Sequence, residues 1–252
     1  MNLKAITPLI LTYNEEANIS RTLDRLHWAE RIVVVDSYST DSTLDILSSY
    51  ESVEVYQRTF DHFADQCNFG LEQIKTGWTL SLDADYVLSQ SFLSELQALT
   101  PAADGYAAVF TYCIFGKPLR GNLYPPRTVL YKTSRASYDR DGHAHRVKVG
   151  SSIGKLHSPI YHDDRKPLFS WLDAQKRYAK IEAEKLEAQS SNALGAADRL
   201  RKTGLAPFAV PLYCLIRKRL ILDGEAGLYY TMQRTYAEAL LALYILDNRL
   251  RG

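Results

Sequence analysis

The strongest constraint on the fold is an alternation of strand-like runs with helical patterns over residues 1 to 100. Residues 4–12 and 31–36 are apolar and rich in β-branched side chains, as in strands buried on both faces of a sheet, and further candidates cover 53–57 and 78–82. Helical patterns separate these runs, over 14–27, 40–50 and 62–74. Strands alternating with helices are typical of βαβ units, so the sequence predicts an α/β fold with a mostly parallel sheet flanked by helices.

The pattern changes after Pro101. Strand-like pieces cover residues 106–115, 128–132, 146–149 and 153–161, and they are separated by Gly, Pro and charged turns. This part is predicted to extend the sheet in an α+β manner. From Pro167 onward the chain is predicted to be helical, over 168–189, 205–222 and 225–247.

Composition sets broad limits. The chain has 252 residues, of which 46% are apolar, enough for one large core or for a core with a small appendage. Cys67, Cys113 and Cys214 lie far apart and form no CxxC pair, so they indicate neither a disulfide framework nor a zinc cluster. Met1 leads directly into an apolar strand without a basic leader, from which we expect a cytosolic protein.

Charge is divided unevenly along the chain. Residues 1 to 110 contain six Lys and Arg against sixteen Asp and Glu, a net of −10, whereas residues 111 to 252 contain 24 against 13, a net of +11. A basic half attracts nucleotides, anionic lipids or nucleic acid. Ordinary solvated faces whose signs happen to segregate explain the division equally well.

Two polar motifs follow the first two predicted strands, at the sheet edge where ligands of such folds bind. Residues 12–16 read TYNEE, and by itself this motif is better explained as a helix cap. Residues 36–41 read DSYSTD. Capping of the next helix explains Ser39 to Asp41 but not Asp36, whose carboxylate at a strand end is suited to accept hydrogen bonds from a base or ribose.

A third motif, Asp83-Ala84-Asp85, follows the strand predicted over 78–82. Mg²⁺ and Mn²⁺ prefer oxygen ligands and typically lie between one or two carboxylates and the phosphates of a substrate. A bare Asp-x-Asp is often only a turn. At the end of a buried strand, however, two desolvated like charges are costly without a cation, which favours a metal site.

The fourth motif is the run Asp139-Arg140-Asp141-Gly142-His143-Ala144-His145-Arg146. Its carboxylates, imidazoles and guanidinium groups can supply a base, a metal ligand and a phosphate contact from one loop. A solvated charged turn is an equally good interpretation.

An apolar run at residues 205–216 is followed by the basic residues Arg217, Lys218 and Arg219. Because spanning a bilayer takes about 20 apolar residues, this run is too short to cross one. An interfacial helix on anionic lipid and a buried helix of the second half or of a dimer explain the run equally well.

Taken together, the segments ILTYNEEANI, RIVVVDSYSTDST, FADQCNFGL and WTLSLDADY resemble family 2 glycosyltransferases of the GT-A fold. More narrowly, the chain is similar to the lipopolysaccharide core β-1,4-glucosyltransferase-like branch, whose members are small, cytoplasmic and membrane-peripheral. The resemblance covers residues 4–165 and continues loosely through 220–230. It implies a GT-A domain over 1–165, with a nucleotide-binding half (1–100) and an acceptor half (101–165), and a helical C-terminal extension over 166–252 that associates with membrane.

The resemblance also implies roles for individual residues. Asp85 is implied as a metal ligand, Tyr13 as a base-stacking ring and Asp36 as a hydrogen-bond partner of the base. The nucleotide-binding residues implied are Thr12, Tyr13, Asn14, Glu15, Asp36, Gln66, Asn68 and Asp83.

The sequence departs from the family pattern in two ways. Tyr86 follows the Asp-x-Asp motif where many relatives have Glu, and the usual acidic pair that supplies the base is absent. Asp141 is therefore the candidate base, with His143 as an alternative base or a metal ligand.

The function implied is that of an inverting, metal-dependent glycosyltransferase. With Mn²⁺ or Mg²⁺ it would move a hexose from a nucleotide-sugar, UDP-glucose or a similar UDP-hexose, to a lipopolysaccharide-core or other lipid-linked glycan. We expect it on the inner face of the cytoplasmic membrane, in contact with anionic lipid. Nucleic acid is not an expected partner, since the interleaved stacking motifs of RNA-binding modules are absent. The sequence fixes neither the sugar, the linkage nor the oligomeric state.

Two other function classes remain at this point. A sugar-phosphate nucleotidyltransferase would also use a parallel sheet and a metal, but it usually has a glycine-rich basic loop after the first strand, where this chain has the acidic TYNEE. A catalytically degenerate GT-A protein that only binds is the second, because a fold does not by itself settle function.

Overall fold

The computed structural model describes residues 1–139, 147–189 and 194–251. The chain divides into two compact units. The first contains residues 1–115 and 124–165, and the second contains 116–123 and the residues from Lys166 onward.

The first unit is built on a mixed sheet with the strand order β3-β2-β1-β4-β8-β6-β11-β5. Strands β1, β2, β3 and β4 pair in parallel, and so do β6 and β11, whereas β8 is antiparallel to β4 and β6, and β5 is antiparallel to β11. The strands are β1 (Ile6–Thr12), β2 (Ile32–Asp36), β3 (Val53–Gln57), β4 (Trp78–Asp83), β5 (Tyr86–Leu88), β6 (Gly105–Ile114), β8 (Arg127–Lys132) and β11 (Ile153–His162). The short strands β9 (Ser137–Tyr138) and β10 (Val147–Lys148) form a separate antiparallel pair.

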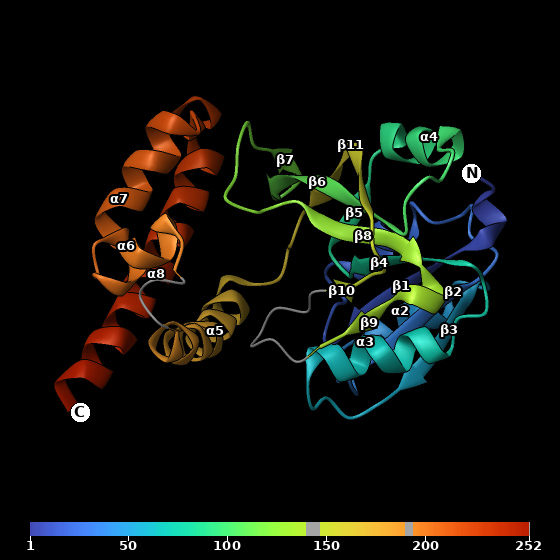
Figure 1. Ribbon diagram of the computed structural model, residues 1–252, viewed down its shortest axis with the longest axis horizontal. Helices are drawn as coiled ribbons and strands as arrows, with labels where there is room; N and C mark the ends of the chain where they lie inside the picture. Colours follow the sequence, from blue (N-terminus) through green and yellow to red (C-terminus); the bar gives the residue numbers. More distant parts are fainter. Residues whose placement is uncertain (140–146, 190–193, 252) are drawn as a thin grey trace. The chain divides into compact units, whose positions relative to one another are not determined.

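Alternating side chains of the central strands supply two cores, one on each face of the sheet. In β2, Ile32 and Val34 join one core, while Val33 and Val35 join the other. The first core is covered by α1 (Ile19–Leu23), α2 (Thr43–Ser48) and α4 (Gln90–Ala98), and the second by α3 (Phe63–Glu72), so that α4 and α3 lie on opposite sides of the sheet in Figure 1. Each fully buried aliphatic side chain contributes about 1.5–3 kcal/mol, which explains why these strands are apolar on both faces.

Strand β11 contains an irregularity between Lys155 and Pro159, where its register against β6 shifts. The Glu95 carboxylate of α4 accepts hydrogen bonds there from the backbone N–H groups of His157 (2.8 Å) and Ser158 (2.7 Å). A side chain thus satisfies donors that the irregular strand leaves without a ladder partner.

The second unit is helical. It contains α5 (Leu168–Ala188), α6 (Ala196–Lys202), α7 (Ala206–Leu212), a π-helical turn η4 (Tyr213–Arg217), a 3₁₀ turn η5 (Leu220–Asp223) and α8 (Glu225–Arg251), with the two-residue strand β7 (Lys117–Pro118) in its other segment. Buried residues of α5 and α8 form its core. Residues 116–123 are bound within this unit, since the Leu123 N–H donates to Tyr230 Oη (2.8 Å) and the Arg120 N–H donates to Asp223 (3.0 Å).

Two predicted helices were wrong in extent. The helix expected over 14–27 is only α1, because residues 13–18 form a loop. The helix expected over 205–222 is broken: Pro211 lacks an N–H, the hydrogen bond from Lys218 N–H to Tyr213 C=O closes a wider π-type turn, and Arg219 then takes a left-handed φ of 58° that ends the helix.

Candidate active site

Three motif residues lie together at one edge of the sheet. Parallel pairing places Thr12 of β1 opposite Asp36 of β2, and Leu11 of β1 opposite Asp83 of β4. The carboxyl ends of these neighbouring strands therefore bring the first three sequence motifs to one place, the usual position of ligand sites in such sheets.

Asp36 is fully buried and held by several donors. Its Oδ1 accepts hydrogen bonds from Thr12 Oγ1 (2.9 Å) and Ser39 Oγ (2.5 Å), and its Oδ2 accepts from the Ser39 N–H (2.9 Å) and Gln57 Nε2 (3.4 Å). The carboxylate therefore has a fixed orientation at the strand end, which a group that recognises a ligand by hydrogen bonding requires.

The loops after β1 and β2 are joined to each other. The Asn14 N–H donates to Ser39 Oγ (2.9 Å), Asn14 Oδ1 accepts from the Thr40 N–H (2.8 Å), and the Glu15 N–H donates to Thr43 Oγ1 (2.8 Å). Asn14 itself has a left-handed φ of 53° and does not cap α1, whose N-cap residue is Asn18. The capping interpretation of the TYNEE motif was therefore wrong for Asn14.

Two aromatic side chains project from these joined loops. Tyr13 is 54% exposed and Tyr38 is 53% exposed, and Tyr38 has a left-handed φ of 61°. Exposed rings next to a buried carboxylate provide a surface on which a planar base can stack.

Gln66 and Asn68 of α3 face different partners. Gln66 is buried; its Nε2 donates to Ser37 Oγ (2.9 Å) and its Oε1 accepts from Arg58 (2.9 Å), so it lies beside the loop after β2. Asn68 instead forms a two-way backbone pair with Tyr138, in which Nδ2 donates to the C=O and Oδ1 accepts from the N–H, both at 2.9 Å. Asn68 therefore holds β9 rather than the strand-end loops.

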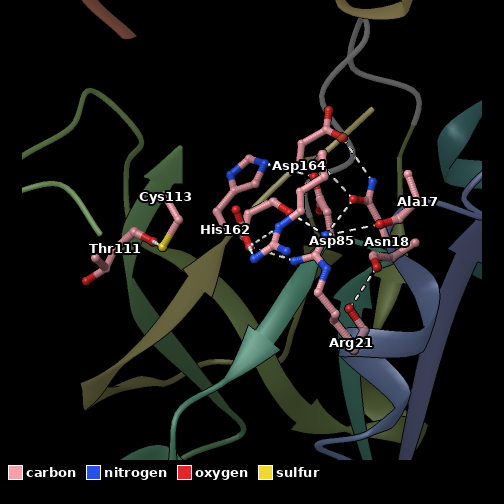
Figure 2. Close-up of polar contacts among 12 residues, drawn as sticks. Ala17, Asn18, Arg21, Asp85, Thr111, Cys113, His162 and Asp164 are labelled. Carbon is pink, nitrogen blue, oxygen red and sulfur yellow. Dashed lines mark hydrogen bonds and ion pairs between the residues drawn. The ribbon is translucent and has the colours of Figure 1, made fainter. Parts of the chain in front are cut away.

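At the end of β4, Asp85 lies next to a histidine that the sequence analysis did not select. His162 Nε2, at the end of β11, is 3.1 Å from Asp85 Oδ2, and each side chain is 15% exposed (Figure 2). Burial opposes the charged imidazolium, but attraction and hydrogen bonding from Asp85, with smaller contributions from Asp83 and Asp164, outweigh it and raise the pKa of His162. Nδ1 of His162 is buried, and within the described residues it has no hydrogen-bond partner.

Aromatic rings surround this pair. The His162 ring lies 4.7 Å from the ring of Tyr112, 4.8 Å from that of Tyr124 and 5.2 Å from that of Tyr86, measured between centroids. The Arg127 guanidinium lies 4.8 Å from the Tyr124 ring centroid, and the Tyr86 and Tyr124 hydroxyls are hydrogen-bonded to each other. The Arg127 cation also interacts electrostatically with Asp83, the last residue of β4.

The described part of the chain shows no group of three or more His, Cys, Asp and Glu side chains arranged as a metal cage. Mg²⁺ and Mn²⁺ bound with a phosphorylated substrate commonly take only one or two protein carboxylates, and Asp83 and Asp85 provide two at one strand end. The donor set therefore fits such an ion completed by substrate phosphates. Asp141 and His143, the candidate base and alternative ligand, lie outside the described residues.

The missed residues are His162, which ends β11, and Asp163 and Asp164, which follow it directly. The rule that ligands gather at carboxyl ends of strands identifies them, provided that it is applied to the second half of the sheet as well as to the first.

Comparisons with known proteins agree with this geometry. The sequence model of glycosyl transferase family 2 matches residues 9–154. The lipopolysaccharide core biosynthesis glycosyltransferase LpsC of Rhizobium meliloti is 28% identical in an alignment of 152 positions that covers 56% of this chain and 55% of LpsC. An uncharacterized glycosyltransferase of Rickettsia typhi is 31% identical over 38% of this chain and 32% of its own length. The chain thus spans about half or less of the length of these curated relatives.

Solved structures show the same fold. The mannosyltransferase PcManGT of Pyrobaculum calidifontis, in complex with GDP-Man and Mn²⁺, aligns with 98% of this chain and 87% of its own chain at a TM-score of 0.56 and 15% identity. S. aureus TarS 1–349 in complex with UDP-GlcNAc aligns with 98% of this chain and 92% of its own at a TM-score of 0.53 and 15% identity. From the family match over more than half of its length, we conclude that this chain belongs to glycosyl transferase family 2 and has the GT-A fold.

Proposed function

We propose that this chain transfers a hexose from a nucleoside diphosphate sugar, a UDP-hexose such as UDP-glucose, to a hydroxyl of a glycan acceptor, with inversion at the anomeric carbon. The observation that carries the proposal is the convergence of Asp36, Asp83 and Asp85 at one edge of the sheet. The similarity to LpsC supports the transfer of a glycosyl group, and the UDP-GlcNAc and GDP-Man bound by TarS and PcManGT support a nucleoside diphosphate sugar as the donor.

The nucleotide is assigned to the joined loops after β1 and β2. Asp36, fixed by Thr12 and Ser39, would accept a hydrogen bond from the base in place of the long one from Gln57 Nε2 (3.4 Å), and the exposed Tyr13 ring would stack on the base. Asn14 and Glu15 keep this loop in place through their bonds to the loop after β2. Gln66 sets the position of Ser37 within the same loop.

Asp83 and Asp85 would hold a divalent cation, Mn²⁺ or Mg²⁺, with the diphosphate. When bound, the ion supplies positive charge to the leaving group. The acceptor hydroxyl must also lose a proton as it attacks, and Asp141 is the base that we assign, with His143 as the alternative. No covalent enzyme intermediate is needed for a single displacement.

The rate of nucleoside diphosphate release, measured across UDP-, GDP- and TDP-sugars with and without Mn²⁺ or Mg²⁺, tests this function. We expect turnover of one donor only with metal, and loss of that turnover in Asp85→Asn by on the order of 100-fold or more. Asp45→Asn, on an exposed position of α2, is the matched control. Release of pyrophosphate instead would support a nucleotidyltransferase, and binding of a donor without turnover would support a protein that only binds.

We also propose that the second unit contacts an anionic membrane and thereby meets a lipopolysaccharide-core or other lipid-linked acceptor at the inner face of the cytoplasmic membrane. Phe208 is 74% exposed and Ile216 is 70% exposed, and the basic residues 217–219 follow directly. An apolar surface beside basic side chains suits anionic lipid headgroups. Within the described residues, no helix is long and apolar enough to span a bilayer.

Cosedimentation with phosphatidylcholine vesicles, with and without phosphatidylglycerol, tests this contact. We expect binding that requires phosphatidylglycerol, decreases at high salt and is lost in Phe208→Ser/Ile216→Ser. Leu250→Ser, at an exposed apolar position near the end of α8, is the control and should bind as the unaltered protein does. Failure of the unaltered protein to bind either vesicle would refute the contact.

A further inference from the structure

Asn18, the N-cap residue of α1, is buried to 1% exposure and uses its side-chain amide fully. Its Nδ2 donates to Glu15 Oε2 (2.8 Å) and to Asp164 Oδ1 (2.9 Å). Its Oδ1 accepts from Arg21 Nη2 (2.7 Å) and from the Arg165 N–H (2.9 Å). One amide thus joins the loop after β1 to the segment after β11, as Figure 2 shows for Asn18, Arg21 and Asp164.

Arg21 strengthens this junction. Its Nη1 donates to Asp163 Oδ2 (2.6 Å) and its Nη2 donates to the Asp163 C=O (2.9 Å). Burial lowers the pKa of Arg21, against the attraction of Asp163, so the cation is partly desolvated and its geometry is correspondingly specific.

The segment after β11 and helix α1 are both bound to the backbone of the Asp-x-Asp loop. The Asp163 N–H donates to the Asp85 C=O (3.1 Å), and Thr22 Oγ1 of α1 donates to the Ala84 C=O (2.7 Å). His162, the neighbour of Asp163, lies against the Asp85 carboxylate. Hydrogen bonds therefore run from Glu15 through Asn18 to Asp164. The two residues before Asp164 then contact Asp85, Asp163 at its backbone and His162 at its side chain.

The two hydrogen bonds that the Asn18 amide donates, to Glu15 and to Asp164, depend on each other. Glu15 and Asp164 are both carboxylates, and the two N–H groups of one amide are shared between them. Because planar amide geometry fixes the angle between those two N–H groups, a shift of Glu15 changes the hydrogen bond available to Asp164.

We infer that Asn18 is a positioning residue that couples nucleotide binding at the loop after β1 to metal binding at Asp85. This inference rests on the proposed function. Coupling between two ligands is a free energy, and it is reciprocal: the metal must raise the affinity for nucleotide by the factor by which nucleotide raises the affinity for metal. Part of that factor arises from direct contact between metal and diphosphate, and the inferred part passes through Asn18 and Asp164.

The test uses Asp164, the partly exposed residue at which the Asn18 amide joins the segment after β11, because replacing the buried Asn18 would also destabilise the fold. Asp164→Ala removes the acceptor of the Asn18 amide, whereas Asp164→Asn keeps an oxygen in its place. Asp24→Ala, which removes an exposed carboxylate at the C-terminus of α1 bonded to Tyr50 Oη, is the matched control. Isothermal titration gives the Kd of UDP with and without Mn²⁺, and the ratio of the two values is the coupling factor.

We expect Asp164→Ala to lower that ratio by about three- to tenfold, and Asp164→Asn and Asp24→Ala to retain it. Melting temperatures are measured alongside, since a purely structural role would lower them and leave the ratio unchanged; that result, or equal effects in Asp164→Ala and Asp24→Ala, overturns the inference. If the unaltered protein binds neither UDP nor GDP with Mn²⁺, the proposed function fails first and the coupling fails with it.

Discussion

His162 Nε2 and Asp85 Oδ2 lie 3.1 Å apart, although His162 ends β11 and Asp85 lies in the turn between β4 and β5. Aromatic rings surround the imidazole, and the carboxylate belongs to the Asp-x-Asp motif. A partner that orients a ligating carboxylate contributes to metal affinity, so His162 would affect the affinity of the metal site proposed at Asp85.

His162→Gln is therefore expected to weaken Mn²⁺ binding in the presence of UDP by about ten- to a hundredfold, because Asp85 loses the group that fixes its orientation. The concentration of free Mn²⁺, followed by electron paramagnetic resonance, measures this affinity. His157→Gln, an exposed position on the same strand, should leave it unchanged. Equal Mn²⁺ affinity in His162→Gln and the unaltered protein would remove His162 from the metal site.

Arg127 is expected to assist the leaving diphosphate. Burial opposes its charge, but Tyr124, Tyr86 and Asp83 outweigh burial and raise the pKa of Arg127, so it stays a cation that the Asp83 carboxylate attracts. Arg127→Gln should lower kcat/KM for the donor by about ten- to a hundredfold, as expected for loss of a charged hydrogen bond. Arg127→Lys should recover only part, since an ammonium cannot stack flat on Tyr124. Steady-state kinetics measure both, and Arg25→Gln, exposed on the surface, serves as the control.

Much of the fold was predictable because burial on both sheet faces leaves a local signal. The apolar runs over 4–12 and 31–36 contain the buried strands β1 and β2. The strand predicted over 53–57 is confirmed as β3, although its side chains are exposed or half-buried. Strand β5 and helix α4 were not predicted. The first has three residues, and both lie in a stretch without a long apolar period.

The site was predictable only in part, for a related reason. Thr12, Asp36 and Asp83 meet because neighbouring parallel strands end together, which the order of motifs already implies. The approach of His162 to Asp85 depends on β11 lying between β6 and β5, a long-range pairing that no local pattern encodes. The assignment of Asp141 and His143 stays a prediction.

Glu95 should make the free energy of unfolding of the first unit depend on pH in the acidic range. Burial works against its charge, but hydrogen bonds from the His157 and Ser158 N–H groups outweigh burial and lower the pKa of Glu95 from its ordinary value of 4.5. A carboxyl with a lowered pKa stabilises the fold fully above its unfolded-state pKa and loses that contribution as the pH falls through its folded-state pKa. Glu95→Gln should thus cost about 1 kcal/mol in the free energy of unfolding at pH 7, and the difference should shrink as the pH falls below 4.5.

Urea unfolding of both proteins at several pH values measures that difference. Glu72→Gln, at the end of α3, provides the control, with a difference near zero throughout. A Glu95→Gln difference that stays constant from pH 7 to pH 3 would contradict the assignment of the stabilisation to the ionised carboxylate.

Gly227→Ala should disrupt the start of α8, because a Cβ at this position would lie 1.9 Å from the carbonyl oxygen of Leu220. That oxygen belongs to the backbone of η5, so the turn must move rather than a flexible side chain. Overpacking of this kind costs about 1–3 kcal/mol. Since η5 also carries Asp223, which binds Arg120, the melting temperature of the protein and the protease resistance of residues 116–123 should fall together.

The control is Gly195→Ala in the same unit, where an added Cβ meets nothing within 4 Å. It should change the free energy of unfolding by less than about 0.5 kcal/mol. Equal stability of the two variants would mean that η5 can shift without cost, and the close approach of Gly227 to Leu220 would then not be what fixes this turn.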